Sequence, residues 1–271
     1  AMRAKYAADP EFQKHEALLD NGIDLARLTY PEVRTLRCQM QYIFQDPYSS
    51  LNPRMTVANI IGEGLLAHKY CKKANERMHE EILQTMEDCG LAPYFLHRYP
   101  HQFSGGQRQR IGIARSLAVH PKFVVCDEAV SALDVSIQSQ IINLLQDLKE
   151  QQHLTYLFIT HDLSVVKYIS DRIGVMYLGN LVELADSQEI FDHPMHPYTE
   201  ALLESIPTTE EKRDLAVLEG DIPSPVNPPK GCKFHTRCKY CTEICTHVVP
   251  DWEEVTPNHF VACHHKLHTN E

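Results

Sequence analysis

One polar, glycine-rich tetrapeptide in the middle of the chain restricts its possible folds more than any other feature. The tetrapeptide is Ser104-Gly105-Gly106-Gln107, and it opens a run with helical character that extends to Leu117. Serine is a preferred first residue of helices, and a helix start presents free backbone N–H groups and a positive dipole end. The sequence therefore predicts a helix over residues 105–117. Its start is either an ordinary cap or a site for a phosphate group.

A strand ending in two adjacent carboxylates follows this helix. The apolar residues 123–126 precede Asp127 and Glu128. Two carboxylates at a strand end suit a magnesium ion and a water molecule. Acidic residues are also common where a strand meets a loop without any ligand. The succession of the motifs, rather than this pair alone, indicates a nucleotide site.

Apolar runs separated by helical patterns predict an α/β fold. Strands are expected at residues 41–44, 123–126, 156–160 and 173–176, and a turn with a final strand at 177–184. Residues 135–148 carry apolar side chains at helical spacing, and Asp134 can cap that helix. Because helices separate the last three of the four strands, we expect those three to lie parallel in one buried sheet.

Composition and charge exclude several classes of function. The chain has 271 residues and a formal net charge of -10, which does not favour nucleic acid as a partner. No apolar run approaches the roughly 18 residues that cross a bilayer. The first residues lack an apolar core, so no secretory signal is expected.

The cysteines are concentrated near the C-terminus. Five of the nine lie there, and they are Cys232, Cys238, Cys241, Cys245 and Cys263. Without a secretory signal, clustered thiols are more typical of metal binding than of disulfides. Few apolar residues separate them, so we expect this tail to need some stabilising link, such as a bound metal, in order to fold. Reduced thiols without a ligand are the alternative.

The order of these motifs resembles the ATP-binding subunits of ABC transporters. Gln45, before Asp46-Pro47, resembles the Q-loop glutamine, and His161, after the strand at 156–160, resembles the switch histidine. Residues 44–57 and 193–199 resemble the oligopeptide and dipeptide importers in particular. The resemblance covers roughly residues 18–265.

The resemblance implies ATP and Mg²⁺ as ligands and assigns roles to residues. Asp127 and Gln45 would hold Mg²⁺, Glu128 would polarise the attacking water, and His161 would contact the γ-phosphate. Other residues would serve the ATP site of a partner subunit. They are the signature residues Ser104, Gly105, Gly106 and Gln107, and the D-loop residues Ser131 and Asp134.

The resemblance also implies a domain organisation. Residues 1–220 would form an ABC-type P-loop NTPase core that is incomplete at its N-terminus, with a helical subdomain at about 55–118. Residues 221–271 would form a Pro-rich linker and a small Cys-rich extension. Four of the tail cysteines match a set that holds an iron–sulfur cluster in some members. Cys232, Cys238, Cys245 and Cys263 would then bind a [4Fe–4S] cluster or zinc.

The resemblance places the chain on the cytoplasmic face of the plasma membrane as a peripheral subunit. Its partners would be a second ABC ATP-binding subunit and two transmembrane permease subunits. The process would be peptide import. A soluble ABC ATPase of DNA repair or translation, and a metal-sensing module dominated by the tail, are the alternatives.

One family motif does not occur in the sequence. The phosphate loop, Gly-x-x-x-x-Gly-Lys-Ser/Thr, is found nowhere in these 271 residues. In the family, Glu128 and His161 would act with a phosphate loop on their own chain. We therefore expect this polypeptide alone to hydrolyse ATP weakly or not at all. It could instead be a non-catalytic subunit that donates its signature to a partner's site.

Overall fold

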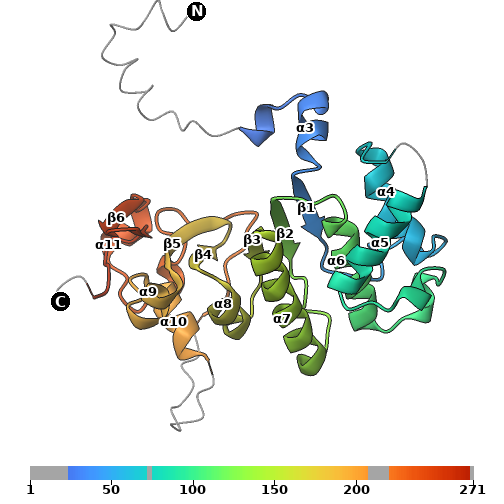
Figure 1. Cartoon of the computed structure of the whole chain (residues 1–271). Helices are drawn as coiled ribbons and strands as arrows, with labels where there is room; N and C mark the ends of the chain where they lie inside the picture. Colours follow the sequence, from blue (N-terminus) through green and yellow to red (C-terminus); the bar gives the residue numbers. More distant parts are fainter. Residues whose placement is uncertain (1–23, 72–74, 207–219, 269–271) are drawn as a thin grey trace, which may run out of the picture.

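The computed structural model describes residues 24–71, 75–206 and 220–268, which form two β-sheets with helices around them (Figure 1). The strands are β1 (Met40–Ile43), β2 (Phe123–Asp127), β3 (Thr155–Ile159), β4 (Arg172–Tyr177), β5 (Asn180–Asp186), β6 (Glu253–Thr256) and β7 (His259–Val261). The helices are α3 (Tyr30–Leu36), α4 (Val57–Ala67), α5 (Glu76–Asp88), α6 (Gly105–Leu117), α7 (Val135–Gln152), α8 (Leu163–Ile169), α9 (Ser187–Asp192), α10 (Pro197–Glu204) and α11 (Glu243–His247). Short 3₁₀ turns lie at Leu25–Arg27, Pro93–Phe95, Pro100–Gln102 and His235–Arg237.

The first sheet is parallel and has the order β1-β2-β3. Its strands confirm three of the four predicted runs. Val124 and Cys126 of β2 are fully buried and belong to the main apolar core, which also contains Ile141 and Leu145 of α7. The side chains of Leu157 and Ile159 on β3 are 49% and 46% exposed in the described part of the chain. One face of this sheet is therefore packed, and β3 leaves apolar surface on the other.

The predicted strand at 173–176 exists, but its expected place in the parallel sheet was wrong. It is β4, and it pairs antiparallel with β5 in a second sheet of order β4-β5-β7-β6. The reason is the turn between them. Tyr177 pairs with Asn180, and Leu178 and Gly179 between them have φ values of 44° and 76°. Two consecutive left-handed residues make a tight hairpin turn, which returns the chain beside β4.

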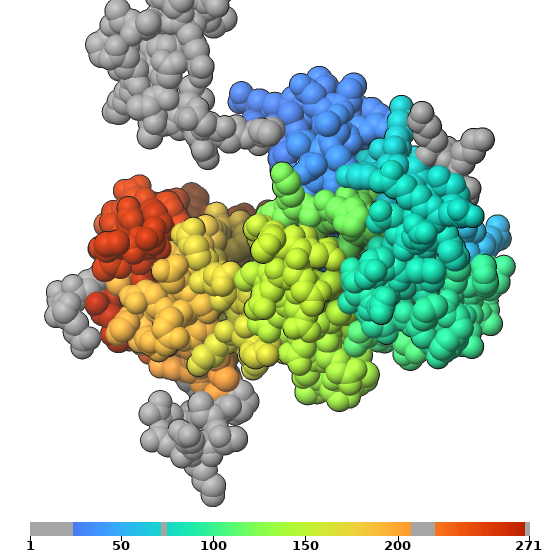
Figure 2. Space-filling model, in the orientation of Figure 1, coloured from blue at the N-terminus to red at the C-terminus, as the bar shows by residue number. Residues whose placement is uncertain are grey.

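The second sheet combines strands that are far apart in the sequence. Val261 of β7 pairs with Glu183 of β5, so the tail completes the sheet that residues 172–186 begin. Figure 2 shows the C-terminal residues, in red, packed directly on the segment that contains β4 and β5. The described tail is therefore held to the rest of the protein by backbone hydrogen bonds.

A buried carboxylate strengthens this join. Glu183 is 0% exposed, and its Oε1 accepts the backbone N–H of Met195 (2.6 Å) and lies 2.8 Å from Nε2 of His259 on β7. Its Oε2 accepts the backbone N–H of His196 (3.1 Å). Buried carboxylates require such partners. Glu183 thus connects β5, β7 and the start of α10.

Helices α4, α5 and α6 gather beside β1 at one end of the molecule (Figure 1). Their buried side chains, among them Ile61, Met86 and Ile111, continue the main core. The predicted helix at 105–117 is confirmed as α6, and the pattern at 135–148 lies within α7. None of the helices in the described ranges has the length and apolar character that crossing a bilayer requires.

Candidate nucleotide site and thiol pocket

The ends of the parallel strands bring three predicted residues together. Gln45 follows β1, Glu128 follows β2, and His161 follows β3. The amide Nε2 of Gln45 donates to Oε2 of Glu128, and Nδ1 of His161 lies 3.3 Å from Oε1 of the same carboxylate. Because the carboxyl ends of parallel strands meet at one edge of a sheet, this arrangement follows from the strand order.

The backbone of Glu128 is in an unusual conformation. Its φ is 44°, in the left-handed region, and its N–H donates to the carbonyl of Ile159 (2.9 Å). Left-handed backbone is costly for a residue with a side chain and is often found at functional sites. Here it turns the chain sharply after β2, so that Glu128 lies between Gln45 and His161 rather than continuing the strand.

Asp127 has a partner that the sequence did not reveal. The hydroxyl of Tyr42 on β1 donates to Oδ2 of Asp127. This bond is the main cause that raises the pKa of Tyr42 above its usual value. Tyr42 pairs with Val125 in the sheet, which places it on the same face as Asp127. The contact could not be predicted from the sequence, because it depends on the register between β1 and β2.

The signature residues form the capped start of α6. The N–H of Gln107 donates to Oγ of Ser104 (3.4 Å), and the N–H of Ser104 donates to Oε1 of Gln107 (3.1 Å). This reciprocal pair is a capping box. Gly106 has a packing role, since a Cβ there would lie 2.4 Å from Cγ2 of Ile137 on α7. The two helix starts therefore touch.

The D-loop residues connect the carboxylate cluster to this contact. The N–H and Oγ of Ser131 both donate to the carbonyl of Glu128 (3.1 and 3.0 Å). Asp134 caps α7, because its Oδ1 accepts from Oγ of Ser136 (2.6 Å) and from the N–H of Ile137 (3.1 Å). These bonds hold the pKa of Asp134 below its usual value.

Two arginines of α6 hold the segment after Gln45, and the sequence reasoning missed both roles. The guanidinium of Arg108 lies 3.6 Å from the ring centre of Tyr48 and donates to the carbonyl of Pro100. Arg115 donates to the carbonyl of Ser50. The helical pattern of the sequence predicts only which face of α6 is buried. It does not predict that the segment after Gln45 lies against that helix.

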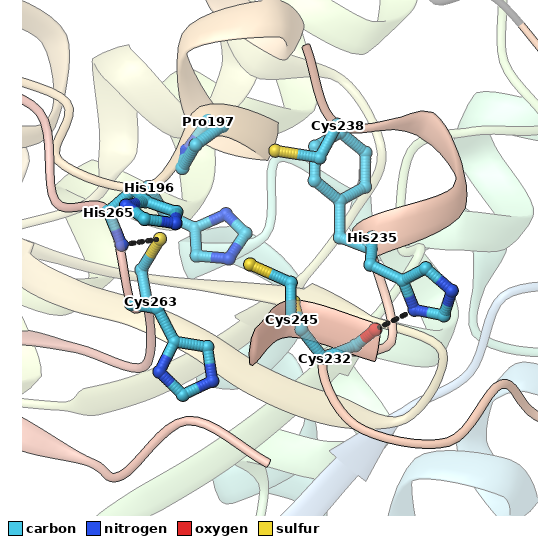
Figure 3. Close-up of a pocket in the computed structure, with 10 residues that line it drawn as sticks. His196, Pro197, Cys232, His235, Cys238, Cys245, Cys263 and His265 are labelled. Carbon is cyan, nitrogen blue, oxygen red and sulfur yellow. Dashed lines mark hydrogen bonds between the residues drawn. The ribbon is translucent and has the colours of Figure 1, made fainter. Parts of the chain in front are cut away.

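Four of the five tail cysteines line one pocket, shown in Figure 3. Its lining consists of His196, Pro197, Cys232, Phe234, His235, Cys238, Cys245, Cys263, His264 and His265. Cys241 is exposed and is not part of the lining. The pocket therefore selects the four cysteines of the predicted set and leaves out the fifth.

Two of these thiols are hard to ionise in the absence of a cation. Burial, with a smaller contribution from the neighbouring thiols, raises the pKa of Cys263 to about 12 and that of Cys238 to about 11. Four thiolates are the donor set of zinc and iron–sulfur centres, and a bound cation would offset their repulsion. Among the described residues, no group of three or more His, Cys, Asp or Glu side chains is arranged to hold a metal ion as it stands.

A glycine fixes the two cysteine segments against each other. The N–H of Cys232 donates to the carbonyl of Cys245 (2.9 Å). Gly231 has a φ of 63°, and a Cβ there would lie 2.4 Å from that carbonyl oxygen. Only a residue without a side chain allows this close backbone contact.

Comparison with known proteins identifies the class of molecule. The family "ABC transporter" matches residues 9–131, and the family "Oligopeptide/dipeptide transporter, C-terminal region" matches residues 182–245. Among solved structures, the dimeric cassette MJ0796 bound to ADP and Pi is 27% identical with a TM-score of 0.55. The match covers 62% of this chain and 72% of the MJ0796 chain. CbiO1 of Clostridium perfringens is 25% identical with a TM-score of 0.54, covering 60% and 63%. The fold is that of an ABC ATPase.

Two relatives narrow the class. The oligopeptide transport ATP-binding protein AppF of Bacillus subtilis is 52% identical over 253 residues, which are 91% of this chain and 76% of AppF. OppF of Haemophilus influenzae is 47% identical over 246 residues, 89% of this chain and 74% of OppF. The chain belongs to the family of oligopeptide-transporter ATP-binding proteins.

Proposed function

We propose that this chain is a nucleotide-binding subunit that couples ATP binding and hydrolysis to peptide import through a membrane ABC transporter. The observation that carries the proposal is the convergence of Gln45, Glu128 and His161 beside Asp127 at one edge of the parallel sheet. The named relatives are oligopeptide transport proteins. The subunit would work at the cytoplasmic face of the plasma membrane with a second ATP-binding subunit and two permease subunits.

The residues at the sheet edge have separable roles in this proposal. Asp127 and Gln45 would hold Mg²⁺, which supplies charge neutralisation of the phosphates when bound. The amide nitrogen of Gln45 donates to Glu128, which leaves its oxygen as the ligand atom. Glu128 would orient the attacking water and accept its proton. His161 would contact the transferred phosphate.

Residues 104–107 would serve a partner's ATP rather than the chain's own. Ser104 caps the start of α6, which packs on the start of α7, where Asp134 is the cap. A subunit that donates its signature to a partner's site without hydrolysing ATP itself is the second candidate.

Steady-state hydrolysis of Mg-ATP tests the division of labour. The 271-residue chain alone is expected to hydrolyse no more than the background rate. Mixed with a peptide-import ATPase subunit that has its phosphate loop, it should raise the rate above that of the subunit alone. Hydrolysis by the isolated chain at the rate of the intact subunit would contradict the expected background rate. No effect on the partner would contradict signature donation.

We also propose that Cys232, Cys238, Cys245 and Cys263 bind a [4Fe–4S] cluster, with zinc as the alternative. The support is their shared pocket and their thiolate chemistry. Metal analysis and visible absorption after anaerobic purification measure the content. Replacing Cys245 with serine is expected to remove most of the iron or zinc. Cys241→Ser is the matched control and should keep it, because Cys241 does not line the pocket. Equal losses in both variants would contradict this assignment.

A further inference from the structure

His259 is a buried histidine that no step of the proposed nucleotide chemistry uses. It lies on β7, in the tail, and is 1% exposed. β7 joins the tail to β5, where Val261 pairs with Glu183 and Phe260 pairs with Leu184. His259 is therefore placed at the join between the tail and the rest of the protein.

Two carboxylates from different elements face the two nitrogens of this ring. Nε2 of His259 lies 2.8 Å from Oε1 of Glu183 on β5, and Nδ1 lies 3.7 Å from Oε1 of Glu189 on α9. Within the described ranges, Nδ1 is buried and has no hydrogen-bond partner. The side chain of Glu183 is 0% exposed and that of Glu189 is 41% exposed. The ring thus links a buried carboxylate to a partly exposed one.

The partners of Glu183 indicate that Nε2 of His259 carries a proton. The two oxygens of Glu183 accept the backbone N–H groups of Met195 (2.6 Å) and His196 (3.1 Å), which can only donate. Such bonds favour the ionised carboxylate. An ionised carboxylate is an acceptor only, so the hydrogen bond between the two side chains requires the proton to be on Nε2.

The surroundings of Nδ1 favour a second proton on the same ring. Without a proton, Nδ1 would be a buried acceptor that faces the carboxylate of Glu189 and lacks a donor. With a proton, it becomes a donor toward that carboxylate. The positive ring then also offsets the negative charge of Glu183, which is costly to bury without a counter-charge.

The other titratable groups around this network place no permanent positive charge against His259. On β6, Glu254 adds a negative charge, and its Oε1 accepts a backbone N–H of the turn to β7 (2.8 Å). After α9, Nδ1 of His193 lies 3.6 Å from the second oxygen of Glu189. Burial lowers the pKa of His196 to about 4, so the ring of that residue is neutral.

We infer that His259 is an imidazolium whose charge is shared between Glu183 and Glu189, and that this charge makes the attachment of the tail dependent on pH. The carboxylates face the ring only in the folded protein, so folding of the tail and protonation of His259 favour each other. The stabilisation is complete below about pH 6.5, where an unfolded histidine is also protonated, and it is lost as the pH rises.

Nitrogen NMR of the whole chain, labelled with ¹⁵N in its histidines, tests the charge directly. The ring signals of His259 are assigned by correlation with its backbone. At neutral pH, both ring nitrogens are expected to carry a proton. A ring with one unprotonated nitrogen overturns the inference, whichever nitrogen it is.

Urea denaturation tests the pH dependence. It is followed by the fluorescence of Trp252, which stacks on Phe260 beside His259. The range runs from about pH 6.5 to about pH 8, because unfolded cysteines ionise near pH 8.5 and would add their own effect. The urea midpoint of the wild-type chain is expected to fall across this range. In His259→Gln, the amide can still donate to Glu183 but has no proton to lose, so the midpoint should be lower and nearly constant.

Glu189→Gln and His193→Gln are a matched pair at the exposed end of the network, and both should fold because neither side chain is buried. Glu189→Gln removes the carboxylate that faces Nδ1 and should reduce the pH dependence. His193→Gln should leave it unchanged. A wild-type midpoint that does not fall with pH overturns the inference, as does an unchanged pH dependence in Glu189→Gln. An equal loss in both variants also overturns it, because His193 would then be the group that titrates.

Discussion

Replacing Ser104 with aspartate is expected to lower the hydrolysis that this chain supports at a partner's ATP site by about 10²-fold or more. Aspartate is as good a helix cap as serine, so α6 should still form. The new carboxylate would stand where the helix start meets phosphate, and like charges repel strongly in a closed site. Loss of a single donor to a developing negative charge already costs about 10²–10³-fold in rate. The measurement is hydrolysis by the mixed pair of subunits.

A second helix cap provides the control for Ser104→Asp. Asn75 caps α5, where its Oδ1 accepts the N–H of Met78 (3.0 Å), and it is exposed. Asn75→Asp adds the same charge at a comparable position without approaching the proposed nucleotide site, and it should leave the rate of the pair unchanged. Full activity of Ser104→Asp would show that α6 does not face a nucleotide. Equal losses of rate in both variants would show that the added net charge lowers the rate, whatever its position in the chain.

Gly231→Ala is expected to destabilise the tail by about 3–5 kcal/mol, combining left-handed strain with a steric clash. The added Cβ would lie 2.4 Å from the carbonyl oxygen of Cys245 and 2.8 Å from the carbonyl carbon of Thr246. These are backbone atoms, which cannot move aside as a flexible side chain can. Trp252 is the only tryptophan in the chain and stacks on Phe260 of β7, so its fluorescence during urea denaturation reports on this segment.

Gly179→Ala is the control that measures the cost of a left-handed backbone without a steric clash. Gly179 also has a positive φ, of 76°, but a Cβ there would meet no atom within 4 Å. Its substitution should cost only the backbone term, about 1–2 kcal/mol. If Gly231→Ala destabilises no more than Gly179→Ala, then the close contact with Cys245 does not contribute, and the proposed packing of the two cysteine segments is wrong.

Local patterns were sufficient for the parallel strands and for the helices that flank the candidate site. The capping residues Ser104 and Asp134 mark the first turns of α6 and α7, where the sequence placed them. Gln45, Glu128 and His161 could be grouped in advance because each follows a predicted strand. Their bonds to one another arise from the common direction of those strands.

Long-range pairing could not be predicted in the same way. The residues of β4 have the apolar alternation of a strand, but that pattern does not say which edge the strand joins. The sheet that β4 joins depends on the turn at Leu178-Gly179 and on β7, which lies more than seventy residues further along the chain. Tyr42 was missed for a related reason, because only the register of β1 on β2 brings its hydroxyl to Asp127.

The contact between Gly106 and Ile137 has a mechanical consequence. Since the side chain of Ile137 on α7 packs directly on the backbone of α6 at Gly106, the two segments that carry Ser104 and Asp134 can hardly tilt independently. An approaching subunit would then meet both segments simultaneously or neither. Both segments should therefore contact a partner subunit in a single step. A bulkier residue at Gly106 should uncouple the two contacts before it destabilises either helix start.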